Sequence, residues 1–201
     1  MSARVKYGKS RGEIFTCPPV TPELQSELIQ TWVAVTNSGG AGVGFLPPVS
    51  VSDVSPVAAD LMEKVMRNDA HLIVARNEEQ ELLGWLAIVR NRDHTQNHWA
   101  WVKRMHVIAP YQGKGWGSAM LSAAIEICHS EGLAQVYLTT DGQSKSLKFY
   151  SSHGFSEVGR MPRNTLSMDG TFHDEVYMMM ELGPGSGTLK TAMSASTGCE
   201  R

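Results

Sequence analysis

Hydrophobic positions recur at helical spacing in two stretches near the start of the chain. A first stripe runs from Leu24 to Val35 after a proline, and it ends in a glycine-rich segment. A second stripe follows a serine–proline pair and holds Val57, Leu61 and Val65. The pattern predicts two amphipathic helices, the second starting near residue 55, joined by a flexible loop.

Runs rich in β-branched and aromatic residues predict a sheet beyond residue 70. The runs 71–76 and 81–90 flank a polar turn, which indicates a hairpin, and the run 98–109 adds a third consecutive antiparallel strand. The later part of the chain alternates two helical stretches with strands at 135–140, 154–160 and 174–182. This mixed order predicts an α/β fold.

The segment PYQGKGWGSAM, residues 110–120, joins a predicted strand to a predicted helix. Its glycines leave backbone N–H groups unpaired near the positive end of the helix dipole, and they let an anion approach closely. Gln112 and Lys114 add side-chain donors. The segment therefore favours a pyrophosphate as ligand, although glycines at such a junction can also serve only as a turn.

Two common phosphate motifs do not match this spacing. A P-loop requires Gly-x-x-x-x-Gly-Lys-Ser/Thr, and a dinucleotide fingerprint requires Gly-x-Gly-x-x-Gly within an early parallel βαβ unit. Here position 118 is Ser118, and the preceding strands form a meander.

Composition excludes several classes of protein. The chain has 201 residues and a formal net charge of -2, so it has no global attraction for nucleic acid or for an anionic membrane. Its apolar runs are strand-sized, and the first ten residues lack the apolar core of a signal peptide. We expect a cytoplasmic protein with neither a nucleic-acid partner nor a membrane partner.

Cysteine usage and the C-terminal composition complete this picture. Cys17, Cys128 and Cys199 are far apart, odd in number and without metal-ligand spacing, which favours reduced thiols and no metal site. From residue 183 the sequence becomes small, polar and aperiodic. We expect one domain over 1–182 and a disordered tail over 183–201.

Two segments resemble the signatures of the GNAT superfamily of N-acetyltransferases. RMHVIAPYQGKGWGSAML resembles the first signature, in which Gln112, Gly115 and Gly117 match Gln/Arg-x-x-Gly-x-Gly/Ala, and KFYSSHGF resembles the second. The loop GGAGVGF and the stretch DGTFHDEVYM are also similar to the tabtoxin-resistance branch, so the resemblance covers about 37–182. It implies a mixed, mostly antiparallel six- to seven-stranded sheet flanked by about four helices.

The resemblance implies acetyl-CoA as co-substrate. Its pyrophosphate would contact the amides of Gln112, Gly113, Lys114, Gly115, Trp116, Gly117 and Ser118. Its pantetheine arm would pair with the strand backbone at His106 and Val107, near Gln143 and Phe149. A backbone N–H of that strand would donate to the thioester oxygen as negative charge develops there.

The resemblance also implies a proton donor. Tyr150 matches a tyrosine that protonates or hydrogen-bonds the leaving thiolate, and a phenol with a pKa of about 10 suits this task. The alternative is that Tyr150 and Phe149 are core aromatics at a helix end.

The chain departs from the family at two positions. Trp101 stands where many relatives carry an acidic base, and Gln143 stands where an asparagine is common. The candidates for a base are then His173, Asp174, Glu175 and Asp141. His106 shares no face with Trp101 if the strand is regular, so we interpret it as a core or supporting residue.

These observations favour an acyltransferase that moves an acetyl group to a primary amine, most simply of a small molecule. The expected acceptor-binding residues are Gly44, Phe45, Trp101 and Thr139. The alternatives are a non-catalytic acyl-CoA-binding module and an enzyme that acetylates a peptide or protein amine. The chain would act as a monomer or a homodimer.

Overall fold

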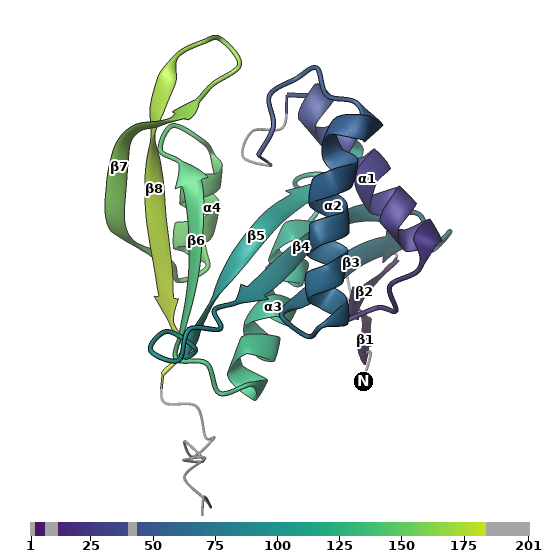
Figure 1. Ribbon diagram of the computed structural model, residues 1–201, viewed down its shortest axis with the longest axis horizontal. Coiled ribbons are helices and arrows are strands. Elements are labelled where there is room, and N and C mark those ends of the chain that lie inside the picture. Colours follow the sequence, from purple (N-terminus) through teal and green to yellow (C-terminus); the bar gives the residue numbers. More distant parts are fainter. Residues whose placement is uncertain (1–2, 7–11, 40–43, 184–201) are drawn as a thin grey trace, which may run out of the picture.

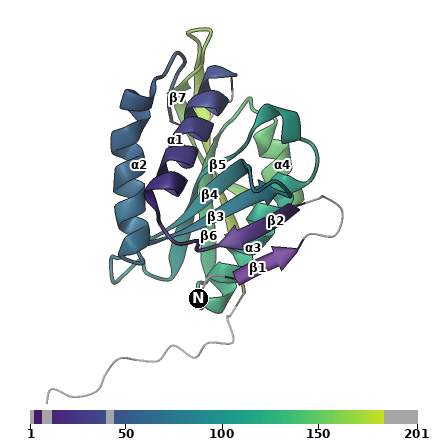
Figure 2. The same ribbon diagram turned by 90° about the vertical axis from the view of Figure 1, so that its right-hand side faces the viewer.

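The computed structural model describes residues 3–6, 12–39 and 44–183, which form one sheet with helices on both faces (Figures 1 and 2). The strands are β1 (Ala3–Lys6), β2 (Gly12–Thr16), β3 (Ala70–Asn77), β4 (Leu82–Arg90), β5 (Trp99–Val107), β6 (Gln135–Asp141), β7 (Ser156–Leu166) and β8 (Phe172–Glu181). The helices are α1 (Pro22–Asn37), α2 (Val51–Met66), α3 (Trp116–Ser130) and α4 (Ser146–Ser152). Residues 184–201 of the predicted tail and 40–43 of the predicted loop lie outside the described residues.

The strand order is β1-β2-β3-β4-β5-β6-β8-β7, and every neighbouring pair is antiparallel except β5 and β6. The predicted fold class is thereby confirmed, with four α-helices among the described residues. The sheet has eight strands because β1 and β2 extend its N-terminal edge. These two strands have only 4 and 5 residues, too few to show a clear alternation in the sequence.

Each face of the sheet has its own apolar core. Helices α1 and α2 cover one face, where Trp32 and Trp85 are fully buried, and α3 and α4 cover the other (Figure 2). Helix α1 starts as predicted, and the Thr21 side chain accepts a hydrogen bond from the Leu24 N–H at 3.2 Å. No helix among the described residues is both long and apolar enough to cross a bilayer.

Helix α2 starts earlier than the sequence predicts. The serine–proline pair suggested a start near residue 55, but the helix begins at Val51 and contains Pro56. Ser50 and Asp53 form a capping box, in which the Ser50 N–H donates to the Asp53 carboxylate at 2.8 Å. This cap supplies the start signal, and the helix tolerates the proline in its second turn.

Strands β5 and β6 separate after a short parallel contact, as Figure 1 shows. They pair only where residues 99–101 face residues 135–137. A β-bulge also shifts the register between β4 and β5, and Arg104 takes a left-handed φ of 57° at this place. The β6-facing edge of β5 is therefore unpaired along its second half, next to the start of α3.

Candidate active site

The glycine loop links the end of β5 to α3. Gly113 and Gly115 have φ angles of 72° and 90°, a region that other residues rarely adopt, and Gly115 is the N-cap of α3. A Cβ atom added at either position would meet nothing within 4 Å, so the space in front of the loop is open. The first amides of α3, beginning at Trp116, face this space with the positive end of the helix dipole.

The side chains of the glycine loop differ in their contacts and exposure. Gln112 donates from Nε2 to the carbonyl oxygen of Val107 at 2.8 Å, which ties the loop to the end of β5. Lys114 is exposed, with Nζ 5.1 Å from the ring centroid of Tyr111. The Trp116 side chain is buried in the core, so this residue can offer a ligand only its backbone N–H. The exposed lysine and the free amides fit a pyrophosphate group.

The two sequence signatures meet at Met105 on β5. A Cβ atom at Gly117 would lie 3.2 Å from Met105 Cε and 3.5 Å from Phe149 Cζ. The hydroxyl of Tyr150 donates to Met105 Sδ at 3.7 Å. Thus the glycine loop and the aromatic pair of α4 converge at Met105, in the part of β5 that lies beyond its last pair with β6.

Tyr150 lies at the centre of this junction. It is buried, and its ring centroid is 5.2 Å from that of Phe149 and 5.9 Å from that of Phe155. Burial raises the pKa of Tyr150 to about 12, because the charged phenolate is poorly solvated there. The hydroxyl therefore keeps its proton and can donate a hydrogen bond to a charged acceptor.

His106 supports the bulge of β5. Its Nδ1 lies 2.9 Å from the carbonyl oxygen of Arg104, which can only accept, so Nδ1 carries the hydrogen. Its Nε2 is buried without a hydrogen-bond partner, and its ring lies 4.8 Å from Trp85. Burial lowers the pKa of His106 to about 4, so the ring is neutral. The bulge makes β5 irregular here, so regular alternation does not determine whether His106 and Trp101 lie on the same face.

A cleft of about 720 Å³ opens where β5 and β6 separate, bounded by α1, α2 and the β7–β8 hairpin. Three of the four predicted acceptor residues, Gly44, Phe45 and Thr139, line it. Trp101 is not among its lining residues. The ring of Trp101 instead packs in an aromatic cluster with Trp99, Tyr137 and Tyr177.

Two consecutive cations, Lys103 and Arg104, both line the cleft, because the bulge breaks the alternation of β5. Desolvation lowers the pKa of each group. The Arg104 guanidinium lies 5.1 Å from the Trp32 ring centroid. A Cβ atom at Gly44 would lie 1.8 Å from Arg104 Nη1, so any other residue at this position would displace the guanidinium.

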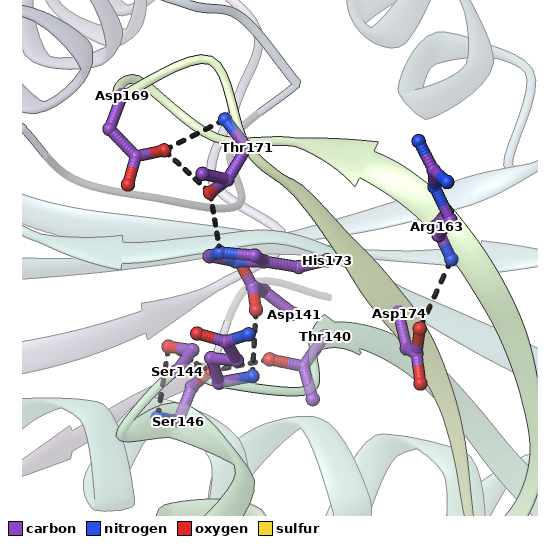
Figure 3. A network of polar contacts seen from close by, with 10 residues as sticks. Thr140, Asp141, Ser144, Ser146, Arg163, Asp169, Thr171, His173 and Asp174 are labelled. Carbon is purple, nitrogen blue, oxygen red and sulfur yellow. Dashed lines mark hydrogen bonds and ion pairs between the residues drawn. The ribbon is translucent and has the colours of Figure 1, made fainter.

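Of the four candidates for a base, two line the cleft and two do not. Asp141 and Glu175 line the cleft, whereas His173 and Asp174 do not. His173 Nδ1 lies 2.8 Å from Asp141 Oδ2, so the imidazole supports the cleft-lining carboxylate from behind (Figure 3). Glu175 accepts a hydrogen bond from Asn164 Nδ2 at 2.7 Å.

The remaining contacts of this network concern the second ring nitrogen of His173 and the carboxylate of Asp174. His173 Nε2 lies 3.0 Å from Thr171 Oγ1, so both ring nitrogens are engaged (Figure 3). Asp174 accepts a hydrogen bond from the Arg163 N–H at 3.1 Å instead of facing the cleft. Gln143 is exposed, and its N–H donates to Asp141 Oδ1 at 2.8 Å.

Sequence reasoning did not identify several cleft residues. Asp60 and Lys64 of α2 line the cleft, as do Lys103 and Arg104 of β5. The signal for the strand residues was a lysine–arginine pair inside an otherwise apolar strand, which has no place in a regular buried ladder. In the part of the chain that the structure describes, no three histidine, cysteine or acidic residues are arranged to hold a metal ion.

Comparisons with known proteins agree with this geometry. The profile of the Acetyltransferase (GNAT) family matches residues 46–155. YwnH of Bacillus subtilis (strain 168), provisionally named a phosphinothricin acetyltransferase, is 28% identical over 112 residues, which is 55% of this chain and 68% of YwnH.

Solved structures of acetyltransferases share the fold. One provisionally named phosphinothricin N-acetyltransferase superposes with a TM-score of 0.69 at 23% identity, over 84% of this chain and 98% of that one. An N-acetyltransferase from Staphylococcus aureus Mu50 superposes with a TM-score of 0.71 at 16% identity, over 86% and 99% of the two chains. The chain therefore belongs to the GNAT family of acetyltransferases and is an acyltransferase.

Proposed function

We propose that this chain transfers the acetyl group of acetyl-CoA to the primary amine of a small molecule, and that residues 1–182 carry the whole activity as one domain. The supporting observation is the junction at Met105. The glycine loop, the open edge of β5 and the Tyr150 hydroxyl meet there, beside the charged cleft.

The acyl donor fits the open side of β5. The amides of Gly113 to Ser118 bind its pyrophosphate, whereas the Gln112 N–H donates to the Ala109 carbonyl oxygen at 3.3 Å. The exposed Lys114 adds charge. The backbone of His106 and Val107 pairs with the pantetheine arm, because β6 turns away from this part of β5. Bound in this way, acetyl-CoA supplies the activated acetyl group next to Tyr150.

The acceptor fits the cleft as a small zwitterion. A volume of about 720 Å³ matches a small-molecule site. Lys103 and Arg104 attract an anionic group, while Asp141 and Glu175 attract an ammonium group. The names of YwnH and of one solved relative point to phosphinothricin, which supports a small-molecule acceptor for this chain as well.

Two residues carry out the proton transfers, one to the acceptor amine and one to the leaving sulfur. Asp141, supported by His173, orients the acceptor amine and receives its proton, since a protonated amine cannot attack. Tyr150 donates its hydroxyl hydrogen toward the leaving sulfur, replacing its weak contact with Met105 by a stronger one to a charged atom.

Steady-state turnover with a panel of amines tests this proposal. The full chain is incubated with acetyl-CoA and with amino acids, polyamines or a lysine-containing peptide, and both CoA and N-acetylated product are quantified by chromatography with mass detection. We expect turnover with amines that also carry an anionic group. Acetyl-CoA binding without turnover for any amine would indicate a binding module, and turnover with the peptide alone would indicate a protein acceptor.

A further inference from the structure

A second cluster of reactive side chains lies at the opposite end of α3 from the glycine loop. Cys17 follows β2, His71 lies on β3, and Glu131 is the C-cap of α3. Helix α3 has 15 residues, so about 20 Å separate this cluster from the glycine loop. The acetyl-transfer chemistry uses none of these three residues.

The three side chains form a continuous hydrogen-bonded row. Cys17 Sγ lies 3.4 Å from His71 Nδ1, and His71 Nε2 lies 2.6 Å from Glu131 Oε1. A carboxylate can only accept, so Nε2 carries a hydrogen. Nδ1 faces Sγ, so a neutral imidazole at His71 can accept the proton of the Cys17 thiol.

The surroundings make His71 a stronger base. The Cys17 and Glu131 contacts together raise the pKa of His71 to about 9. The negative end of the α3 dipole at Glu131 also favours a cation at this place. Arg90 of β4 also contacts Glu131, with Nη1 3.2 Å from Oε2. The Glu131 carboxylate therefore contacts both His71 and Arg90.

Further features allow Cys17 to react. It is partly exposed, unlike Cys128, which is buried. Its backbone takes a left-handed φ of 49° and is fixed by a hydrogen bond from its N–H to the Leu72 carbonyl at 2.8 Å. A strained and fixed backbone of this kind is common at functional sites. Cys17 therefore combines a fixed backbone with partial exposure.

We propose that Cys17 is a nucleophile, paired with the His71 ring that Glu131 holds, and that it reacts with small-molecule disulfides. The Cys17 sulfur attacks one sulfur of the disulfide and gives its proton to His71 Nδ1. A new sulfur–sulfur bond forms to Cys17, and the old one breaks. The other half leaves as a thiolate and takes the proton of His71. The cysteine is oxidised to a mixed disulfide, and the disulfide is the oxidant.

The test measures the reaction of the full chain with dithiobis(nitrobenzoate), whose released thiolate is coloured, and with oxidised glutathione, whose adduct is mapped by mass spectrometry. The parent protein carries Cys199→Ser, because that residue lies outside the described part of the chain. An ordinary thiol with a pKa of about 8.5 is less than about 1% ionised at pH 6. We expect one thiol, Cys17, to react at pH 6 at least about tenfold faster in the folded protein than in urea.

Four variants test whether this cluster is reactive or only structural. Cys17→Ser should abolish the fast reaction, and Cys128→Ser, the matched control, should leave it unchanged. His71→Gln should slow the folded protein about tenfold at pH 6, and Glu131→Gln should slow it less, since Nδ1 still faces the sulfur. Melting curves show that each variant is folded.

Several outcomes would overturn the proposal. These are a Cys17 that reacts no faster folded than unfolded, an unchanged rate in folded His71→Gln, or an adduct on Cys128. The readout needs no acceptor amine, so it stands apart from the acetyl-transfer proposal.

Discussion

Replacing Tyr150 by phenylalanine removes the hydroxyl that we place beside the leaving sulfur and keeps the packed ring. In the resting protein this hydroxyl donates to the thioether sulfur of Met105 at 3.7 Å, a long contact to a weak acceptor. Losing it should lower the free energy of unfolding by less than about 1 kcal/mol. The ring contacts with Phe149 and Phe155 remain.

The effect on turnover should be much larger. A positioned proton donor is worth about 10²–10⁴-fold, which corresponds to about 2.7–5.4 kcal/mol of activation free energy. We expect kcat of Tyr150→Phe to fall by this factor, while the dissociation constant of acetyl-CoA and the melting temperature change little. The assay measures CoA release against acceptor concentration, together with calorimetric titration of acetyl-CoA.

Met105→Leu is the matched control. It removes the resting acceptor of the Tyr150 hydroxyl but keeps an apolar side chain of similar volume. If the hydroxyl acts on the leaving group, this variant should lose far less activity than Tyr150→Phe. Equal losses in the two variants, or a Tyr150→Phe enzyme that turns over as fast as the parent, would refute the proton-donor role.

The other predictions concern the glycine loop, the cleft and the two perturbed histidines. Gly115→Val places a β-branched residue at a φ of 90° and should weaken acetyl-CoA binding at least about tenfold; Gly132→Val, equally left-handed at the far end of α3, should not. Asp141→Asn should lower kcat about 10²-fold without changing the affinity for acetyl-CoA, and an unchanged kcat would exclude Asp141 as the proton acceptor. The free energy of unfolding, from urea titrations, should be highest near pH 6.5. It falls as pH rises toward 9, because the raised pKa of His71 stabilises the protonated folded state, and it falls as pH drops toward 4, because the lowered pKa of His106 favours protonation of the unfolded state. Each change is at most about 3 kcal/mol, and a flat profile would contradict both assignments.

The sequence predicts those parts of the fold that local patterns encode. The stripe from Leu24 to Val35 and the proline before it mark α1 in the sequence itself. Strand β2 depends on its neighbours, because five residues gain stability by pairing with β1 and β3. The start of α2 differs from the one that the serine–proline pair predicts, because the Ser50–Asp53 capping box starts the helix at Val51.

The candidate site is harder to predict from the sequence than the fold, because it depends on a β-bulge in β5. One irregular residue in β5, Arg104, sets which later side chains share a face, and neither spacing nor composition marks its φ of 57°. The meeting of Gly117 and Tyr150 at Met105 joins three distant segments. Motif order predicts that these segments belong to one site, but it does not predict their contacts.

The central claim is that the glycine loop and the free edge of β5 together bind acetyl-CoA, and calorimetric titration of the full chain tests it most directly. Acetyl-CoA is compared with S-acetylpantetheine, which keeps the thioester arm and lacks the pyrophosphate. We expect acetyl-CoA to bind at least about tenfold more tightly, a difference of at least about 1.4 kcal/mol, because only it reaches the amides of Gly113 to Ser118. Equal affinities, or no binding of acetyl-CoA, would contradict this account of the site.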